Sequence, residues 1–394
     1  MVEESRLARR MQRVSSSAIM ELLKATAKGS YISFASGLPD PSLFPAEQIA
    51  SITKSILSTD SRTALQYGAA EGYSPLREWV AERLRQRGIA YATPEHILLT
   101  NGSQQAIDLV ARLFLEAGSK VLVESPTYLA ALQTFDSYEA NYCPVSMQEE
   151  GIAVEEAQLA LASEPIALAF TLPNFQNPSG ITQSLARRQR FAELLSERQT
   201  PVLEDDAYYD LRYSGTALPS INSLAKNPYA VYTGTFSKII APGLRVGYLC
   251  AEPSLLARLT QLKQITDLHT GSLTQRIVYQ FCERGLLEPQ IATQNAVYGA
   301  RLRVLLEALQ IHFGSQLHWT TPQGGMFVLL TLPEGYDAAV LLKKAMERGI
   351  VYVPASSFYP NGGGANLLRL NFVSATEEAI KTGIAILAEV IHSA

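Results

Sequence analysis

Between residues 95 and 250, short apolar runs alternate with amphipathic stretches of helical period, and no other feature limits the fold as strongly. The expected strands are "HILLT" (96–100), "KVLVES" (120–125), "IALAFTLP" (166–173), "PVLEDD" (201–206), "AVYTGT" (230–235) and "RVGYLCA" (245–251). Strands that alternate with helices predict βαβ units, and therefore a mostly parallel sheet with helices on both faces. We expect an α/β fold whose ligands bind at the carboxyl ends of the strands.

The pattern changes after residue 252, where long helical segments begin. From about residue 316, "GGMFVLLTL" and "NLLRLNFV" are typical of strands, and two helical segments accompany them. This mixture predicts a smaller α+β unit, for which a chain of 394 residues is long enough. We expect a large domain over residues 50–290, which carries the ligand site, and a small domain that combines residues 1–49 with residues 291–394.

The composition excludes several classes of protein. Hydrophobic residues make up 47% of the chain, so a sizeable core is expected and disorder is not. A net charge of −4 argues against a broad electrostatic contact with nucleic acid, and no apolar run approaches the roughly 20 residues that cross a bilayer. Three scattered cysteines do not predict a disulfide framework, and the N-terminus lacks a secretory pattern. We expect a soluble cytoplasmic protein without nucleic-acid or membrane partners.

Polar residues gather just after the apolar runs, at the edge where ligands are expected. In "TNGSQQAID", Gly102, Ser103 and Gln104 stand where a strand gives way to a helix, whose free N–H groups suit an anion; an ordinary helix N-cap is the alternative. Tyr128 in "ESPTYLA" suits either stacking on a planar ligand or simple packing. Asn177 in "PNFQNPSG" precedes a proline, so a turn is its default interpretation. Each cluster alone is weak evidence for a site.

An acidic cluster follows the fourth apolar run. In "LEDDAYYD", Asp205 comes almost directly after the apolar residues, and Tyr208 stands three positions later. A carboxylate at a buried strand end requires a cationic partner, or else its pKa rises. A metal ion would be another partner, but the five histidines stand apart and none pairs with an acid at ligand spacing. We therefore expect no metal.

The segment "TGTFSKIIAPGLRVGYL" (233–249) contributes Thr235, Ser237, Lys238 and Arg245. Two hydroxyls and a guanidinium suit a phosphate, while a lysine near cations should have a lowered pKa and act as a nucleophilic amine. A planar, phosphorylated cofactor with a carbonyl group and a basic ring nitrogen would engage all of these clusters. That description fits pyridoxal 5′-phosphate.

Seven motifs, in this order, carry a resemblance to a known family. They are "SFASGLPDPSLFP", "LQYGAAEGYSPLREWV", "TNGSQQAIDL", "NFQNPSG", "EDDAYY", "TFSKIIAPGLRVGY" and "LRLNF". Over nearly its whole length the chain resembles the fold-type I, class I/II aminotransferases, in particular the subgroup of the 2-aminoadipate and kynurenine aminotransferases. The resemblance implies a large domain with a mostly parallel sheet, a smaller α+β domain, and pyridoxal phosphate as cofactor.

The resemblance also implies a role for individual residues around the cofactor ring. Lys238 matches the lysine that forms the Schiff base and moves the substrate proton, and Asp205 matches the acid that holds the ring nitrogen protonated. Tyr208 and Asn177 match the groups that hydrogen-bond the ring hydroxyl, and Tyr128 matches the stacking aromatic residue. The implied phosphate cradle consists of Gly102, Ser103, Gln104, Thr235, Ser237 and Arg245.

Other matches concern the substrate and a second subunit. Arg369 in "LLRLNF" matches the arginine that binds the substrate α-carboxylate, and its alternative is a buried structural ion pair. Gly37 matches the segment that lines the substrate pocket. Tyr67 matches the tyrosine that reaches the neighbouring subunit's cofactor phosphate, which implies a homodimer with shared active sites. Met20 stands where some members carry an arginine for an acidic side chain, and this favours aromatic or aliphatic donors over 2-aminoadipate.

The function expected from this resemblance is ping-pong transfer of an amino group between an L-amino acid and a 2-oxo acid such as 2-oxoglutarate. A lyase or decarboxylase that uses the same cofactor on the same fold is the nearest alternative. Some bacterial regulators fuse a winged helix to a similar domain, but "SFASGLP" begins at residue 33, which leaves no room for one. A nicotinamide enzyme is disfavoured because no GxGxxG follows a strand.

Overall fold

The largest sheet of the protein is mostly parallel. The computed structural model describes residues 6–14, 21–22, 24 and 31–393, and within them this sheet has eight strands in the order β2-β9-β8-β7-β6-β3-β4-β5. The strands are β2 (Ile97–Thr100), β3 (Lys120–Ser125), β4 (Asn141–Gln148), β5 (Gly151–Ile152), β6 (Ile166–Thr171), β7 (Val202–Asp205), β8 (Ala230–Thr235) and β9 (Gly247–Cys250). Strand β9 runs antiparallel to both β2 and β8, and β5 runs antiparallel to β4; the other neighbouring strands of this sheet are parallel. The predicted α/β fold is confirmed.

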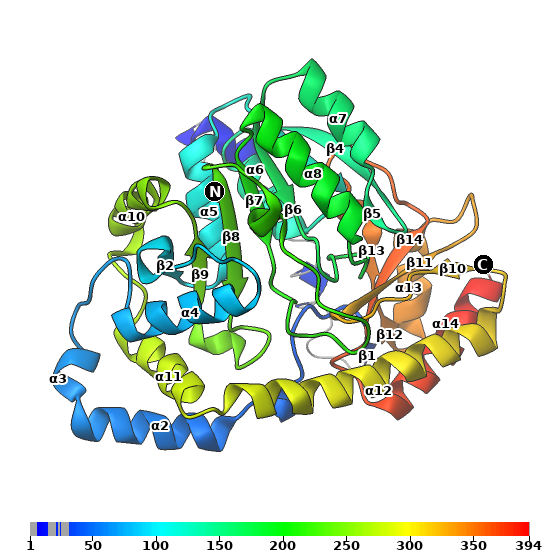
Figure 1. Ribbon diagram of the computed structural model, residues 1–394. Coiled ribbons are helices and arrows are strands. Elements are labelled where there is room, and N and C mark those ends of the chain that lie inside the picture. Colours follow the sequence, from blue (N-terminus) through cyan, green and yellow to red (C-terminus); the bar gives the residue numbers. More distant parts are fainter. Residues whose placement is uncertain (1–5, 15–20, 23, 25–30, 394) are drawn as a thin grey trace.

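Helices cover both faces of this sheet, as Figure 1 shows. One face carries α5 (Ser103–Phe114), α6 (Leu129–Asp136) and α10 (Pro253–Asp267), and the other carries α7 (Val154–Ser163), α8 (Leu185–Arg198) and α9 (Ile221–Leu224). Strand β3 shows the reason. Val121 and Val123 pack with the first set of helices and Leu122 with the second, because successive side chains of a strand point to opposite faces.

A second sheet lies in the C-terminal part of the chain. Its four strands have the order β10-β11-β14-β13 and run antiparallel to their neighbours among the described residues. They are β10 (His318–Trp319), β11 (Phe327–Thr331), β13 (Val353–Pro354) and β14 (Leu367–Asn371), accompanied by α13 (Ala338–Glu347) and α14 (Glu377–His392). Strand β1 (Ile32–Ser33) pairs with β12 (Ile350–Val351), so the segment after residue 31 joins this part of the fold.

Helix α12 (Leu287–Phe313) connects the two parts and packs against α14 (Figure 1). The remaining helices are α2 (Ala46–Thr59), α3 (Ser61–Ala64), α4 (Ser74–Gln86) and α11 (Ser272–Glu283). One hydrophobic core contains side chains of β2 and β8 together with side chains of β11 and β14, so the two sheets share a buried core. The predicted division into domains at residues 49/50 and 290/291 stays a prediction. No helix in the described ranges is long and apolar enough to cross a membrane.

Strands β8 and β9 are antiparallel neighbours, so the segment that connects them lies at one edge of the sheet. Thr235 pairs with Gly247 across these antiparallel strands, and residues 236–246 join them at the carboxyl end of β8. Lys238 and Arg245 both belong to this connection, on either side of a short 3-10 helix, Pro242–Leu244. The two residues therefore lie at the edge where the ligand site is expected.

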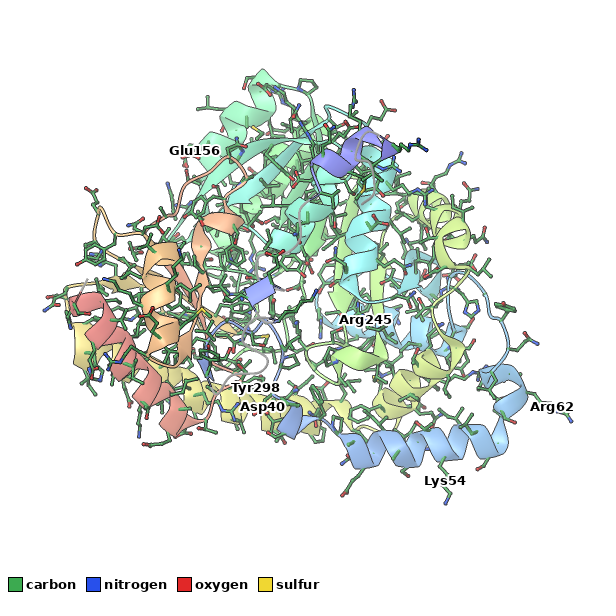
Figure 2. All side chains as sticks on the ribbon, turned by 180° about the vertical axis from the view of Figure 1, so that it is seen from behind. Asp40, Lys54, Arg62, Glu156, Arg245 and Tyr298 are labelled. Atoms are coloured by element: carbon green, nitrogen blue, oxygen red, sulfur yellow. The ribbon has the colours of Figure 1, made fainter. Side chains whose placement is uncertain are left out.

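The segment after β1 is fixed against α12 by Asp40, which Figure 2 shows beside Tyr298. The backbone N–H of Asp40 donates to Tyr298 Oη at 3.1 Å, and its carboxylate pairs with Arg301 Nη1 at 2.7 Å. Asp40 also accepts a hydrogen bond from the Ser42 backbone and so caps the following 3-10 turn. Gly37, three residues earlier, accepts a hydrogen bond from Lys238 and so lies beside the connection between β8 and β9.

Candidate active site

A cavity of about 370 Å³, the central cavity, lies at the carboxyl-terminal edge of the large sheet. Segments from distant parts of the sequence contribute to its wall, as expected where the ends of parallel strands meet. The predicted site residues that line it are Gly37, Ser103, Gln104, Tyr128, Asn177, Asp205, Tyr208, Thr235, Ser237, Lys238, Arg245 and Arg369. One cavity thus brings together most of the candidates that the sequence suggested separately.

Hydroxyl groups and a guanidinium converge on the N-terminus of α5. Thr235 Oγ1 donates to Ser237 Oγ at 2.9 Å, and Arg245 Nη2 donates to the carbonyl oxygen of Asn101 at 2.9 Å. Ser103 begins the helix, so the first N–H groups of α5 have no acceptors within the helix. Such a group of donors suits a phosphate dianion.

Gly102 is required at this turn for two reasons. Its φ of 76° lies in the left-handed region, where a side chain is strained. A Cβ at this position would also lie 2.6 Å from Arg245 Nη2. Arg245 itself adopts a φ of 53°, which is uncommon for a residue other than glycine. The backbone is therefore shaped to bring the guanidinium against the start of α5.

Gln104 contributes in a different way from the other residues of this group. Its side-chain amide donates to Thr134 Oγ1 at 2.8 Å and to the carbonyl oxygen of Ala130 at 3.4 Å, which ties α5 to α6. The side-chain nitrogen thus has acceptors within the protein, and the backbone N–H of Gln104, in the first helical turn, is the group available to an anion.

Asp205 presents a buried carboxylate oxygen without a protein partner. Its Oδ1 has no hydrogen bond among the described residues, whereas the neighbouring Asp206 accepts from Asn174 Nδ2 and Tyr232 Oη, both at 2.8 Å. Burial, and to a lesser extent the charge of Asp206, raise the pKa of Asp205 to about 7. An unpartnered buried acceptor is costly, and a cationic N–H donor of a bound group would satisfy it.

Lys238 is an amine that loses its proton easily. Its Nζ donates to the carbonyl oxygen of Gly37 at 3.0 Å. Burial lowers the pKa of Lys238 to about 8; the attraction of Asp205 partly opposes this effect, and the cations Arg369 and Arg245 support it. A substantial fraction of neutral amine therefore exists at mildly alkaline pH, as nucleophilic and proton-transfer chemistry requires.

Arg369 is a buried guanidinium with spare donors. Its Nη1 donates to Asn177 Oδ1 at 3.0 Å and its Nη2 to the carbonyl oxygen of Ala35 at 2.9 Å, while Nε has no partner in the described part of the chain. The guanidinium lies 4.2 Å from the centre of the Phe327 ring. Burial lowers its pKa to about 10. No carboxylate of the described residues pairs with it, so a structural ion pair does not explain its position.

Two tyrosines complete the wall of the central cavity. Burial raises the pKa of Tyr208 far above its usual value, although the neighbouring Asn177 side chain partly opposes this rise. Burial also raises the pKa of Tyr128 to about 12. Both phenols therefore stay protonated at neutral pH and can act as hydrogen-bond donors.

A support behind the Asn177 turn was not predicted from the sequence. The buried Glu124 of β3 accepts hydrogen bonds from Thr171 Oγ1 at 2.6 Å and Gln176 Nε2 at 3.0 Å. Gln176 also donates to the carbonyl oxygen of Pro126 at 2.6 Å. The turn that carries Asn177 is thereby fixed to the loop that leads to Tyr128. The only signal in the sequence was an acid inside the apolar run "KVLVES".

Three predicted residues are not among the described residues that line the central cavity: Gly102, which forms the turn described above, Tyr67 and Met20. Tyr67 does not line the central cavity; its side chain is 76% exposed and borders a second hollow of about 410 Å³ with Arg62, Ser272 and Arg276. Met20 lies outside the described residues.

Comparisons with known proteins place this geometry in context. A family model described as "Aminotransferase class I and II" matches residues 31–387. The chain is 41% identical over 383 residues to aromatic-amino-acid aminotransferase 1 of Thermococcus litoralis, which covers 96% of this chain and 92% of that protein. The solved structure of LysN, an alpha-aminoadipate aminotransferase of Thermus thermophilus complexed with N-(5′-phosphopyridoxyl)-L-leucine, has a TM-score of 0.92 and 38% identity, covering 99% of this chain and 98% of that chain. For Pyrococcus horikoshii kynurenine aminotransferase, solved in complex with PMP, the TM-score is 0.94 and the identity 39%, with the same coverage.

Proposed function

Because the chain belongs to the class I and II aminotransferases, enzymes that transfer amino groups, we propose that it moves the amino group of a neutral L-amino acid to a 2-oxo acid with pyridoxal 5′-phosphate in the central cavity. The observation that carries this proposal is the unpartnered, buried Oδ1 of Asp205, which lies in the same cavity as the amine of Lys238. The solved relatives named above contain a phosphopyridoxyl group or PMP, in agreement with this choice of cofactor.

Each part of this cofactor has suitable partners among the residues of the central cavity and the adjoining N-terminus of α5. The phosphate would be held by the first N–H groups of α5 together with Ser103, Thr235, Ser237 and Arg245. The unpartnered oxygen of Asp205 would accept a hydrogen bond from the protonated pyridine nitrogen. Asn177 and Tyr208 would hydrogen-bond the ring hydroxyl, and Tyr128 would cover the ring face. When bound, the cofactor supplies a carbonyl carbon that condenses with amines and a ring that accepts electrons.

The protein's own groups would carry the proton and orient the substrate. Lys238 accepts a proton from the substrate α-carbon as a neutral amine and returns it at the other reacting carbon, a task suited to its lowered pKa. Arg369 binds the α-carboxylate through its unpartnered Nε–H and the donors that face the cavity. Arg369 is buried and Lys238 is half-buried, which limits the competition of water for these bonds.

The lining of the central cavity favours a neutral side chain on the amino donor. Its charged residues in the described ranges are Asp205, Lys238, Arg245 and Arg369, and each already has a role. No described cation of the lining remains for a second carboxylate. The rest of the wall includes Leu38, Leu129, Ala130 and Leu172. We therefore propose aromatic or aliphatic donors, with 2-oxoglutarate as one acceptor, and the argument from Met20 stays a prediction.

We further propose that the enzyme is a homodimer in the cytoplasm. Tyr67 and Leu65 are large side chains, 76% and 69% exposed, near the second hollow. A second copy that covered them would bury apolar surface and bring Tyr67 to a neighbouring phosphate. The cytoplasmic location rests on the three free cysteines, which are typical of a reducing compartment.

Visible spectroscopy of the purified protein tests the proposal. The protein should bind pyridoxal phosphate with a visible absorption band, and amino donors should bleach this band while the matching 2-oxo acid appears. Aromatic and aliphatic amino acids should bleach it at lower concentrations than 2-aminoadipate. Failure to bind the cofactor would refute the proposal. A band that persists while ammonia or carbon dioxide accumulates would indicate a lyase or a decarboxylase.

A further inference from the structure

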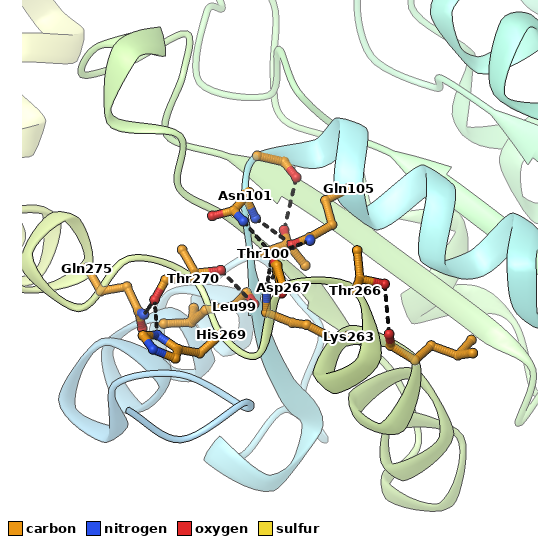
Figure 3. A network of polar contacts seen from close by, with 12 residues as sticks. Leu99, Thr100, Asn101, Gln105, Lys263, Thr266, Asp267, His269, Thr270 and Gln275 are labelled. Atoms are coloured by element: carbon orange, nitrogen blue, oxygen red, sulfur yellow. Dashed lines mark hydrogen bonds and ion pairs between the residues drawn. The ribbon is translucent and has the colours of Figure 1, made fainter. Parts of the chain in front are cut away.

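Four polar residues form a closed ring of hydrogen bonds beside the first turn of α5, to which Asn101 contributes both its side chain and its backbone N–H (Figure 3). The ring, which we call the Lys263 ring, consists of Asn101, Gln105, Lys263 and Asp267. Lys263 Nζ donates to Gln105 Oε1 at 2.8 Å and to Asp267 Oδ1 at 3.0 Å. Asp267 Oδ2 accepts from Asn101 Nδ2 and from Gln105 Nε2, both at 2.5 Å. None of these residues has a role in the proposed mechanism.

The centre of the ring is buried. The side chain of Lys263 has no exposed surface, and that of Asp267 is 22% exposed. Burial lowers the pKa of Lys263, while its hydrogen bond to Asp267 opposes this change. Burying an ammonium group removes its favourable hydration, whereas apolar side chains at the same place would lose no such free energy. A buried ion pair of this kind is therefore better explained by the geometry it imposes than by the stability it adds.

The ring fixes the position of Asn101, three of whose atoms take part in hydrogen bonds. Its backbone N–H donates to Gln105 Oε1 at 2.8 Å and its Nδ2 donates to Asp267. Its carbonyl oxygen accepts from Arg245 Nη2 at 2.9 Å. The chain then passes through Gly102 to Ser103, where the N-terminus of α5 enters the central cavity. The Lys263 ring thus holds the peptide group before the Asn101 Cα, and Arg245 holds the peptide group after it.

The same ring also orders the turn that follows α10. Asp267 ends this helix, and Leu268 reverses the chain with a φ of 64°. Thr270 Oγ1 then donates to the carbonyl oxygen of Leu99 in β2 at 3.3 Å, and the His269 ring meets Tyr67 edge-on with centroids 5.7 Å apart. The end of β2 is therefore fixed on both sides, at Leu99 and at Asn101.

We propose that Lys263 and Asp267 are positioning residues for the cofactor phosphate, acting through Asn101 on the N–H groups at the start of α5. This inference rests on the proposed function. Because glycine at position 102 allows many backbone conformations, the turn depends on such external restraints for its shape. Loss of the ring should weaken the binding of the phosphate group and leave the contacts of the pyridine ring intact.

The test compares two ligands on cofactor-free protein. Dissociation constants for pyridoxal 5′-phosphate and for pyridoxal, which lacks the phosphate, are measured by spectroscopic titration of Lys263→Met and Asp267→Ala. We expect the affinity for the phosphorylated ligand to fall about tenfold or more, and that for pyridoxal to change by less than about twofold. Lys120→Met is the matched control. It breaks the Lys120–Glu164 ion pair at the start of β3, the opposite edge of the sheet, and should change neither constant.

Asn101→Ala provides a second variant if the buried substitutions prevent folding. It removes only the bond from Nδ2 to Asp267 and leaves the ion pair of Lys263 intact. Its expected effect has the same direction and is smaller. Equal losses for both ligands, or unchanged affinity for pyridoxal phosphate in folded variants, would overturn the inference. Wild-type protein that binds neither ligand would instead contradict the proposed function.

Discussion

Asn177 and Arg369 are joined across the central cavity, with Asn177 Oδ1 accepting a hydrogen bond from Arg369 Nη1 at 3.0 Å. The same asparagine side chain neighbours the Tyr208 hydroxyl, whose pKa it influences. One amide therefore lies beside both the group proposed to bind the substrate carboxylate and the group proposed to hold the ring hydroxyl. The position of one ligand is thereby linked to the position of the other.

Replacement of Lys238 should abolish amino transfer while the fold is kept. Lys238→Ala removes the amine proposed to move the proton, and no other described lysine lines the central cavity. We expect turnover to fall by a factor of about 10² or more. Thermal unfolding should change little, and Lys226→Ala, which alters an exposed lysine, should retain turnover. Unchanged turnover in Lys238→Ala would refute the assignment.

Arg369→Met should raise the KM for the amino donor far more than it weakens cofactor binding. Methionine keeps the contact with the Phe327 ring but removes the charged donors. A charge-assisted hydrogen bond contributes about 1.5–3 kcal/mol, so a KM increase of about 10- to 100-fold is expected. Steady-state kinetics give the KM for the amino donor, and titration with the cofactor gives its dissociation constant. Equal losses for donor and cofactor would point to a structural role.

Asp205→Asn should change how the stability of cofactor-free protein depends on pH. The pKa of Asp205 is raised to about 7 from its usual 3.8. Between these values the unfolded chain has released a proton that the folded chain keeps, so this group destabilises the protein increasingly as pH rises from about 4 to 7. The variant should therefore gain stability over wild type across this window, on the order of a few kcal/mol at its upper end.

Urea unfolding of both cofactor-free proteins at several pH values measures this difference. Below about pH 4 the carboxyl group is protonated in both states, and its contribution to the pH dependence should vanish. A stability difference that stays constant from about pH 4 to pH 8 would contradict the raised pKa of Asp205.

Gly102→Ala should weaken cofactor binding, and Gly118→Ala is its matched control. Both glycines have positive φ, 76° and 86°, so alanine strains the backbone at either position by about 1 kcal/mol or more. Only at Gly102 would the new Cβ also meet Arg245, whereas the space around Gly118 is open. Both variants should lose stability, but only Gly102→Ala should lose affinity for pyridoxal phosphate. Equal affinities would exclude a role for Gly102 in the cradle.

The strands and most of the cavity could be predicted from the sequence because they depend on local patterns. The runs ending at Thr100 and Asp205 are buried on both faces and therefore apolar throughout, with polar residues at their ends. Strand β4 was missed because "NYCPVSMQ" is mostly exposed or half-buried and contains Pro144. Such a strand lacks the hydrophobic signal by which a strand is predicted.

Contacts between segments that are distant in the sequence could not be predicted from local sequence patterns. Lys263 and Asp267 stand four residues apart on a helix, a spacing typical of a solvent-exposed ion pair. Only the packing of α5 against α10 encloses them. Glu124 was likewise hidden inside an apolar run, since its partners Thr171 and Gln176 come from another strand and turn.

The bond from Arg369 Nη2 to the carbonyl oxygen of Ala35 joins positions 334 residues apart. The connection between Lys238 and Arg245, by contrast, closes within a hairpin of adjacent strands. Loop-closure entropy makes the hairpin easy to form early, and the Arg369 contact is available only after nearly the whole chain has left the ribosome. The cradle also needs the start of α5, which Arg245 reaches across 144 residues, so it can form once the chain has passed β9. We expect a nascent or truncated chain to acquire the phosphate cradle before it can bind the carboxylate of an amino acid.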